Sequence, residues 1–230
     1  MLLLFFERKF IMATIYPSLM GTNPLKLEQT IKQLDPHVHG YHVDIMDNQF
    51  VPNVTWGAQT VNAIAQATMH PLWVHLMVVK PEDWIQRLEL MGGSIFSFHY
   101  EAVGSNIHFI KQIKEKNWYP SIAISPSTPV EKIFPLLPLV DQVLIMSVDP
   151  GFAGQPFITD VIKKLEPLIG YRASSKLNFR IAMDGGIKLD NIVELAQKGV
   201  EDFAVASGIF DYPDPVEALK ILQDTVAKGL

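Results

Sequence analysis

Short runs of β-branched and aromatic residues alternate along the chain with longer amphipathic stretches, a pattern typical of β-strand–α-helix units that build a parallel sheet. The predicted strands begin near Ile15, Gly40, Leu72, Ile95, Tyr119, Gln142, Phe179 and Asp202. Successive starts are 23 to 37 residues apart, which leaves room for a strand, a helix and two loops in each unit. Eight such units predict an α/β fold in which residues 13–230 form a single (β/α)8 (TIM) barrel. An open doubly wound sheet is the alternative, but no Gly-x-Gly-x-x-Gly motif follows the first strand.

The amphipathic stretches between these runs predict the helices of the barrel. They cover residues 24–34, 57–68, 81–91, 105–115, 129–137, 160–169, 190–197 and 213–226. Several begin with a proline, which the first helical turn tolerates because the missing N–H has no partner there.

Residues 1–12 precede the first unit, and we expect them to form an N-terminal extension outside the core. Their apolar run, residues 2–6, is shorter than a signal-peptide core of about 7 to 15 residues. It is also far shorter than the roughly 20 apolar residues that a membrane helix needs.

The composition narrows the classes of function. With 48% hydrophobic and 19% charged residues, the 230-residue chain can bury a large core, which excludes intrinsic disorder. Its 24 acidic and 19 basic residues give a net charge of −5, a poor match to nucleic acid or an anionic membrane, so we expect a small-molecule partner. The absence of cysteine excludes a thiolate zinc site and a thiol nucleophile, and fits a reducing cytoplasm.

Four ionisable residues are predicted to face the barrel interior: His42, Asp44, His75 and Asp184. Side chains alternate along a strand, so His42 shares a face with Asp44, and each of the four lies near the C-terminal end of its strand, where barrel enzymes place their chemistry. Burying two carboxylates and two imidazoles is costly without compensation. One divalent cation, Zn²⁺, Fe²⁺, Co²⁺ or Mn²⁺, would provide it. A metal-free hydrogen-bond network of Asp and His is the alternative.

Glycine-rich turns follow the last three predicted strands, at residues 151–155, 184–186 and 207–208. Loops after strands seven and eight of this fold commonly bind phosphate through backbone N–H groups, so we expect a phosphate site there. The first turn could instead be a lid over a substrate.

Further candidates lie at the ends of other strands. Met46, Met77 and Met146 are expected at inward strand ends, either as core filler or as an apolar cap over the site. His99 and Glu101 share a face at the end of the fourth strand, where they could serve the site or form a structural pair.

These residues closely resemble the ribulose-phosphate 3-epimerase family of metal-dependent barrel enzymes that act on phosphorylated ketoses. The matching segments are YPSL at 16–19, HVDIMD at 42–47, FVPN at 50–53, HLM at 75–77, MSVDPGF at 146–152, GQ at 154–155 and DGG at 184–186. They occur in the family's order between residues 15 and 210.

The resemblance implies roles for particular residues. His42, Asp44, His75 and Asp184 would bind the metal, and Asp44 and Asp184 would also be the acid/base pair on opposite faces of the substrate. The substrate-binding residues would be Ser18 and His75, with the phosphate surrounded by Gly151, Phe152, Ala153, Gly154, Gly185, Gly186, Ala206, Ser207 and Gly208. From their inward strand ends we also expect Met46, Met77 and Met146 to contact the substrate. Proton transfer at C3 would pass through a metal-stabilised enediolate, with no organic cofactor. The family also suggests a homo-oligomer.

The resemblance leaves the sugar open. Asn48, Trp73 and Ser125 depart from the family's usual residues, while residues 149–157 and 207–210 look more like the allulose-6-phosphate 3-epimerase branch. The default reaction is D-ribulose 5-phosphate to D-xylulose 5-phosphate, and the alternative is D-allulose 6-phosphate to D-fructose 6-phosphate. A non-catalytic phosphosugar-binding barrel and a lyase on the same scaffold are the remaining alternatives.

Overall fold

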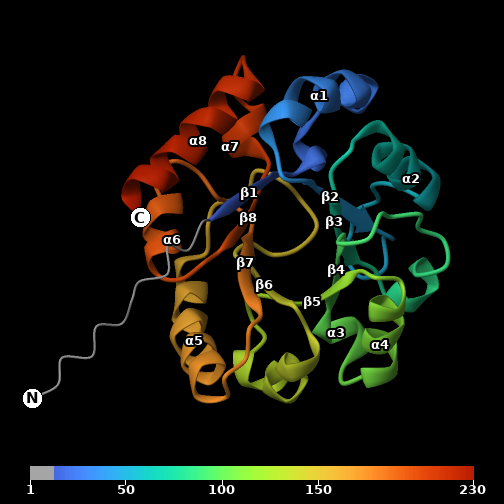
Figure 1. Cartoon of the computed structure of the whole chain (residues 1–230), viewed down its shortest axis with the longest axis vertical. Helices are drawn as coiled ribbons and strands as arrows, with labels where there is room; N and C mark the ends of the chain where they lie inside the picture. Colours follow the sequence, from blue (N-terminus) through green and yellow to red (C-terminus); the bar gives the residue numbers. More distant parts are fainter. Residues whose placement is uncertain (1–12) are drawn as a thin grey trace, which may run out of the picture.

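Eight parallel strands form the centre of the structure, a computed structural model that describes residues 13–230 (Figure 1). The strands are β1 (Thr14–Pro17), β2 (Tyr41–Met46), β3 (Leu72–Met77), β4 (Ile95–His99), β5 (Tyr119–Ile124), β6 (Gln142–Met146), β7 (Arg180–Asp184) and β8 (Asp202–Val205). Each observed start lies within one residue of the predicted one. The (β/α)8 barrel predicted from the strand–helix alternation is therefore confirmed, whereas the predicted boundary at residue 12 concerns residues outside the described ones and stays a prediction.

The order of the strands around the sheet is β1-β8-β7-β6-β5-β4-β3-β2. The first and last strands pair closely, with Thr14 opposite Asp202 and Pro17 opposite Val205. Between β1 and β2 the described residues show only a single parallel bridge, from Ser18 to His42. The barrel is thus nearly closed, and its seam lies between β1 and β2.

Helical segments connect the strands and surround them in Figure 1. The α-helices are α1 (Leu27–Leu34), α2 (Ala58–Ala67), α3 (Tyr100–Val103), α4 (Ile107–Glu115), α5 (Leu165–Ser174), α6 (Ile192–Gln197), α7 (Ser207–Phe210) and α8 (Pro215–Gly229). The 3-10 helices are η1 (Leu19–Gly21), η2 (Pro24–Lys26), η3 (Asp35–His37), η4 (Pro81–Trp84), η5 (Val130–Leu139) and η6 (Thr159–Lys164). None of the described helices has the length and apolar character needed to cross a membrane.

Two of the predicted helical segments are not α-helices in the structure. The segment 129–137 forms the 3-10 helix η5, because Pro135 and Pro138 lack the N–H groups that an α-helix would need inside it. The segment 81–91 forms only the short 3-10 helix η4. Beyond it, the amide of Asn62 donates to the carbonyl of Arg87 and accepts from the N–H of Glu89, both at 3.0 Å, so these backbone groups are taken from any longer helix.

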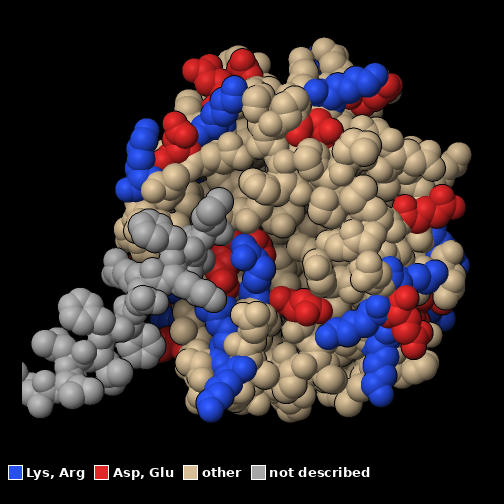
Figure 2. Space-filling model, viewed as in Figure 1, with Lys and Arg blue, Asp and Glu red and all other residues tan. Residues whose placement is uncertain are grey.

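The described residues form one large apolar core cluster and two smaller ones. The large cluster, between strands and helices, includes Val43, Ile45 and Val74. All residues of β2 and β3 are buried. Because side chains alternate along a strand, His42 and His75 point into the barrel interior, and neither is exposed to solvent. On the face shown in Figure 2, Lys and Arg side chains are interspersed with Asp and Glu.

Candidate active site

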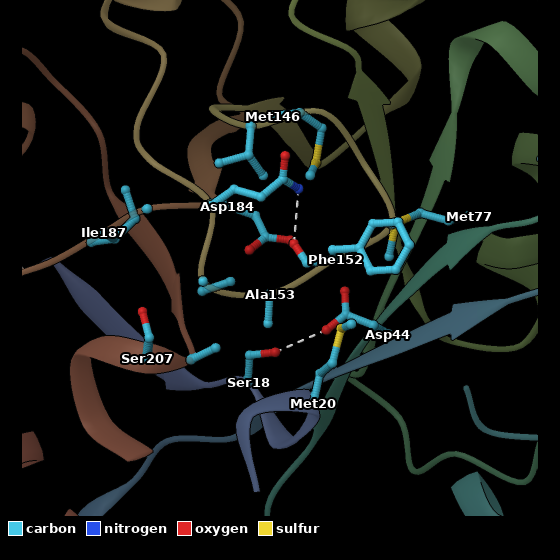
Figure 3. Close-up of a pocket in the computed structure, with 18 of the residues that line it drawn as sticks. Ser18, Met20, Asp44, Met77, Met146, Phe152, Ala153, Asp184, Ile187 and Ser207 are labelled. Carbon is cyan, nitrogen blue, oxygen red and sulfur yellow. Dashed lines mark hydrogen bonds between the residues drawn. The ribbon is translucent and has the colours of Figure 1, made fainter. Parts of the chain in front are cut away.

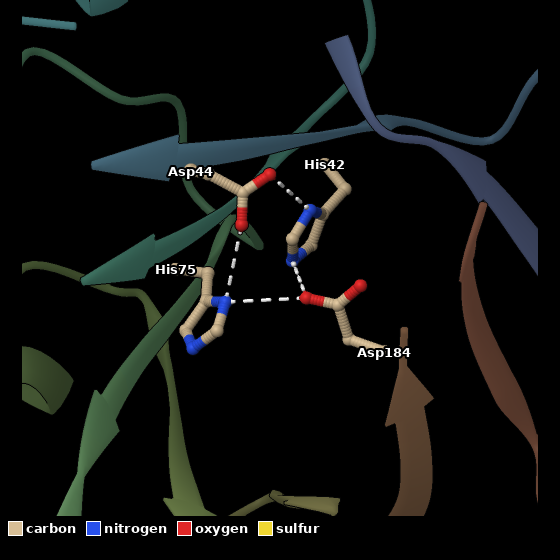
Figure 4. A group of neighbouring side chains, drawn as sticks. All are labelled: His42, Asp44, His75 and Asp184. Atoms are coloured by element: carbon tan, nitrogen blue, oxygen red, sulfur yellow. Dashed lines mark hydrogen bonds and ion pairs between the residues drawn. The ribbon is translucent and has the colours of Figure 1, made fainter. Parts of the chain in front are cut away.

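The structure brings the four predicted interior residues together from β2, β3 and β7 (Figure 4). Asp184 ends β7 as predicted, whereas His42 is the second residue of β2 and not near its C-terminal end. One ligand atom from each of His42, Asp44, His75 and Asp184 lies within 4.8 Å of the others. The Nδ1 atom of His75 lies 3.2 Å from Asp44 Oδ1 and 3.4 Å from Asp184 Oδ2. Strand alternation explains this convergence, because each side chain leaves its strand on the inner face.

A cation fits the group better than hydrogen bonds alone. Nε2 of His42 is buried and has no hydrogen-bond partner among the described residues. It lies 3.8 Å from Asp184 Oδ2, too far for a hydrogen bond. A buried polar atom without a partner is unfavourable, and a divalent cation between two imidazoles and two carboxylates would satisfy it. The group could therefore hold a metal ion.

Ser18 joins this group from the end of β1. Its hydroxyl donates to Asp44 Oδ2 at 2.8 Å and lies 3.3 Å from His42 Nδ1. Because Ser18 and His42 also form the bridge at the barrel seam, the closing point of the barrel and the candidate site coincide.

The site shifts the protonation of two of its members. Burial alone would raise the pKa of Asp44, but the charges and hydrogen bonds of His42 and His75 outweigh it and hold this pKa well below its usual value. Burial alone would lower the pKa of His75, whereas hydrogen bonds to Asp184 and Asp44 raise it to about 9. At neutral pH both ring nitrogens of His75 therefore carry a proton, and a bound cation would displace one of the two.

A second pair lies behind His75. His99 is fully buried and Glu101 has 26% of its side chain exposed. Burial lowers the pKa of His99 to about 4. Burial would raise the pKa of Glu101, but hydrogen bonds from His99, Thr128 and the Ser125 N–H lower it to about 2. This pair thus holds a neutral imidazole beside a carboxylate.

A cavity borders the two carboxylates of the candidate metal site (Figure 3). The carboxylates of Asp44 and Asp184 reach it from β2 and β7. The predicted substrate residues on its wall are Ser18, Met46, Met77, Met146, Gly151, Phe152, Ala153, Gly154, Gly185, Gly186, Ala206 and Ser207. The other two predicted substrate residues do not line the cavity: His75 contacts both carboxylates, and Gly208 is buried against the carbonyl of Ile187.

Sequence reasoning missed part of the wall. The further lining residues are Met20, Val148, Gln155, Ile187 and Ala204. Gln155 donates to the carbonyls of Asp149 at 2.7 Å and Phe152 at 2.9 Å, so it shapes the turn that carries 151–154. The neighbouring loop after β2 is tied to the same turn, because the Asn53 side chain donates to the carbonyl of Gly151 at 2.7 Å.

A (β/α)8 barrel with ionisable groups and a cavity at the C-terminal ends of its strands has the layout of a barrel enzyme. Residues 14–210 match the model of the ribulose-phosphate 3 epimerase family. The chain therefore belongs to this family, which makes it an isomerase of the epimerase type.

Individual relatives agree with this assignment. The chloroplastic ribulose-5-phosphate-3-epimerase of Arabidopsis thaliana is 37% identical over 210 residues, which cover 90% of this chain and 74% of the relative. The ribulose-phosphate 3-epimerase of a Synechocystis strain is 36% identical, covering 89% of this chain and 90% of the relative. Among solved structures, KGPDC from Streptococcus mutans superposes with a TM-score of 0.70 at 13% identity, over 94% of this chain and 98% of that one, and supports the fold alone.

Proposed function

We propose that the protein is a metal-dependent ketose-phosphate 3-epimerase that interconverts D-ribulose 5-phosphate and D-xylulose 5-phosphate. The observation that carries the proposal is the pair of carboxylates, Asp44 from β2 and Asp184 from β7, at the base of one cavity. The names of the relatives in two organisms support the five-carbon substrate.

Inversion at C3 requires two proton-transfer groups. One carboxylate removes the C3 proton, which is weakly acidic because C3 adjoins the ketone at C2. The other carboxylate delivers a proton to the opposite face, since a single base reaches only one face. Asp44 and Asp184 meet this requirement because they reach the cavity from different strands.

The surrounding residues control the charge and position of this pair. The hydroxyl of Ser18 and the Nδ1 atom of His75 orient the Asp44 carboxylate from two sides. His75 Nδ1 also lies 3.4 Å from Asp184 Oδ2, so one imidazole bridges the two carboxylates and fixes their separation. When bound by these residues and His42, a divalent cation would stabilise negative charge developing on the substrate oxygens.

The upper wall of the cavity suits the substrate's phosphate. Gly185 and Gly186 line the cavity together with the turn at 151–154 and with Ser207, the first residue of α7 after β8. Backbone N–H groups in glycine turns after strands seven and eight commonly bind phosphate in this fold. Met46, Met77 and Met146 would shield the reacting carbon from water.

Proton NMR in deuterated water tests the proposal. The metal-loaded protein is mixed separately with D-ribulose 5-phosphate and D-allulose 6-phosphate, and the initial rates of deuterium entry at C3 and of epimer formation are compared. We expect faster reaction of the pentose, and epimer formation at least about 100-fold slower in an Asp184→Asn control. Faster reaction of the hexose would show that the substrate is D-allulose 6-phosphate and not D-ribulose 5-phosphate. No exchange with either sugar would favour a binding barrel, and carbon–carbon cleavage would favour a lyase.

Three properties accompany the proposed function. The cation is Zn²⁺, Fe²⁺, Co²⁺ or Mn²⁺, which elemental analysis of protein purified without chelators identifies. The protein is a homo-oligomer, which light scattering measures. It acts in the cytoplasm, although one relative is chloroplastic, and fractionation of the source cells checks this location.

A further inference from the structure

A line of hydrogen bonds leads from His75 away from the two carboxylates. Its Nε2 atom lies 3.0 Å from Nε2 of His99, and the planes of the two rings differ by 24°, with centroids 5.1 Å apart. Nδ1 of His99 in turn lies 3.2 Å from Oε2 of Glu101. Both imidazoles are fully buried, and the ring of Phe50 packs on His99 with a centroid distance of 4.7 Å. Water therefore has little access to this line.

The far end of the line fixes the orientation of Glu101. Its Oε1 atom accepts hydrogen bonds from the backbone N–H of Ser125 at 2.8 Å and from the hydroxyl of Thr128. The ammonium of Lys164 holds the turn that carries these two donors, because it donates to the carbonyls of Ser125 at 2.8 Å and Thr128 at 2.7 Å. Oε1 is thereby occupied, and Oε2 is left to accept from His99.

The positions of the protons follow from these contacts. A carboxylate oxygen only accepts, so Nδ1 of His99 carries the proton of that ring. A cation bound to Nδ1 of His75 would leave that neutral ring with its single proton on Nε2, so Nε2 of His99, 3.0 Å away, has to accept and carries a lone pair. Of two facing ring nitrogens at hydrogen-bond distance, one must donate, so the proton between the rings belongs to Nε2 of His75. The nitrogen of His75 that is free to give up its proton is then Nδ1, which faces Asp44 and Asp184.

We propose that Glu101 and His99 are positioning residues, which keep a proton on Nε2 of His75 and so reserve Nδ1 of His75 for a divalent cation. The inference rests on the metal site of the proposed function. Neither His99 nor Glu101 lines the substrate cavity, so their role is to act on the site through His75.

Nitrogen-15 NMR of histidine-labelled protein tests the first half of the proposal without any metal or substrate. Ring nitrogens that carry a proton resonate apart from those with a lone pair, and the His99→Gln variant identifies the His99 signals. We expect His99 to show a protonated Nδ1 and a bare Nε2 in the metal-free protein. A protonated Nε2 on His99 in the wild-type protein would overturn the proposal, whatever the variants do.

The variant Glu101→Gln should reverse the direction of hydrogen-bond donation between Glu101, His99 and His75. The N–H of Ser125 and the hydroxyl of Thr128 require the amide oxygen at the Oε1 position, so the amide nitrogen would face His99 and donate to its Nδ1. His99 would then donate from Nε2 to His75, so Nε2 of His75 would lose its proton and the ring would keep only the proton on Nδ1, where it competes with the cation. We expect the affinity for Zn²⁺, measured by calorimetric titration of the metal-free protein, to fall about 10- to 100-fold.

Matched variants separate positioning from a general loss of structure. His99→Gln retains an oxygen that accepts from His75 Nε2 and should keep most of the Zn²⁺ affinity, whereas His99→Leu has no acceptor and should lose it to the same extent as Glu101→Gln. Glu201→Gln removes a comparably buried carboxylate, paired with Arg172 at 2.6 Å just before β8 begins, and should leave Zn²⁺ affinity unchanged.

The outcomes distinguish this inference from the proposed function. Equal Zn²⁺ affinities of folded Glu101→Gln and wild-type proteins would overturn the positioning role, even in an active epimerase. A wild-type protein that neither binds Zn²⁺ nor exchanges C3 protons would instead overturn the proposed function, and the His99 tautomer would still report whether the hydrogen-bond line exists.

Discussion

Replacing Gly186 by alanine measures how closely the turn after β7 packs against the loop after β6. Gly186 has a φ of +64°, and a Cβ atom there would lie 2.7 Å from the backbone nitrogen of Phe157 and 2.8 Å from its Cα. A left-handed φ costs a residue with a Cβ about 1–2 kcal/mol. Crowding an extra methyl group against packed neighbours costs a further ~1–3 kcal/mol. We therefore expect Gly186→Ala to lower the free energy of unfolding by about 2–5 kcal/mol.

Two other glycines separate these contributions. Gly154 has a φ of +76° but open space around its Cβ position, so Gly154→Ala should lose only the conformational part, about 1–2 kcal/mol. Gly170 lies inside α5 with nothing near its Cβ position, so Gly170→Ala should raise the free energy of unfolding by about 0.5–1 kcal/mol.

Urea denaturation followed by circular dichroism compares the three variants with the wild-type protein. The comparison is valid where the variants share one m-value, since a changed m-value indicates a changed unfolded or native state. If Gly186→Ala cost no more than Gly154→Ala, the backbone of Phe157 would yield to the methyl group at no cost. The close-packing explanation of Gly186 would then be refuted.

Further predictions concern the site itself. Asp184→Asn should lower kcat about 100- to 10,000-fold with an unchanged circular dichroism spectrum, because a proton-transfer group is lost, and near-normal turnover would contradict the acid/base assignment. His42→Ala should reduce the metal content found by elemental analysis, and full occupancy would argue against His42 as a ligand. Because the pKa of Glu101 is lowered to about 2, its ionised form stabilises the fold above pH ~4.5, and this stabilisation is lost as the pH falls toward 2. This contribution is at most about 3 kcal/mol, and solvent screening of the exposed quarter of the side chain reduces it. In urea titrations, the difference in free energy of unfolding between the wild-type protein and Glu101→Gln should therefore shrink between pH 5 and pH 2.

The barrel was predictable because its strands carry a strong local signal. Apolar residues alternate or run together over four to six positions in each strand, and the polar exceptions in β2 and β3, His42, Asp44 and His75, fall on one face. That single face is the interior, so the convergence of these residues with Asp184 followed from strand alternation and barrel closure. The helices were less predictable, since the contact of Asn62 with Arg87 and Glu89 joins distant parts of the chain.

The remainder of the site depends on geometry that the sequence pattern does not contain. Gln155 and Ile187 reach the cavity from loops, whose orientation no periodicity describes. The link from His75 to His99 depends on the register of β3 against β4, in which His75 lies opposite Ser97 rather than His99. The stagger of the strands in the barrel then brings His99 to Nε2 of His75. This contact cannot be predicted from the sequence pattern alone.

The pairing of β1 with β8 ties the site to the end of the chain. A polypeptide is synthesised from its N-terminus, so β1 emerges before the other seven strands and can pair with β8 only after all of them have been made. Such distant pairing also slows folding, because a long loop must close before the contact forms. A chain that stops short of β8 would possess His42, Asp44, His75 and Asp184, yet β1 would be left with one bridge to β2. It would lack the strand that holds Ser18 against Asp44, so the reaction centre matures only when translation has delivered the last strand.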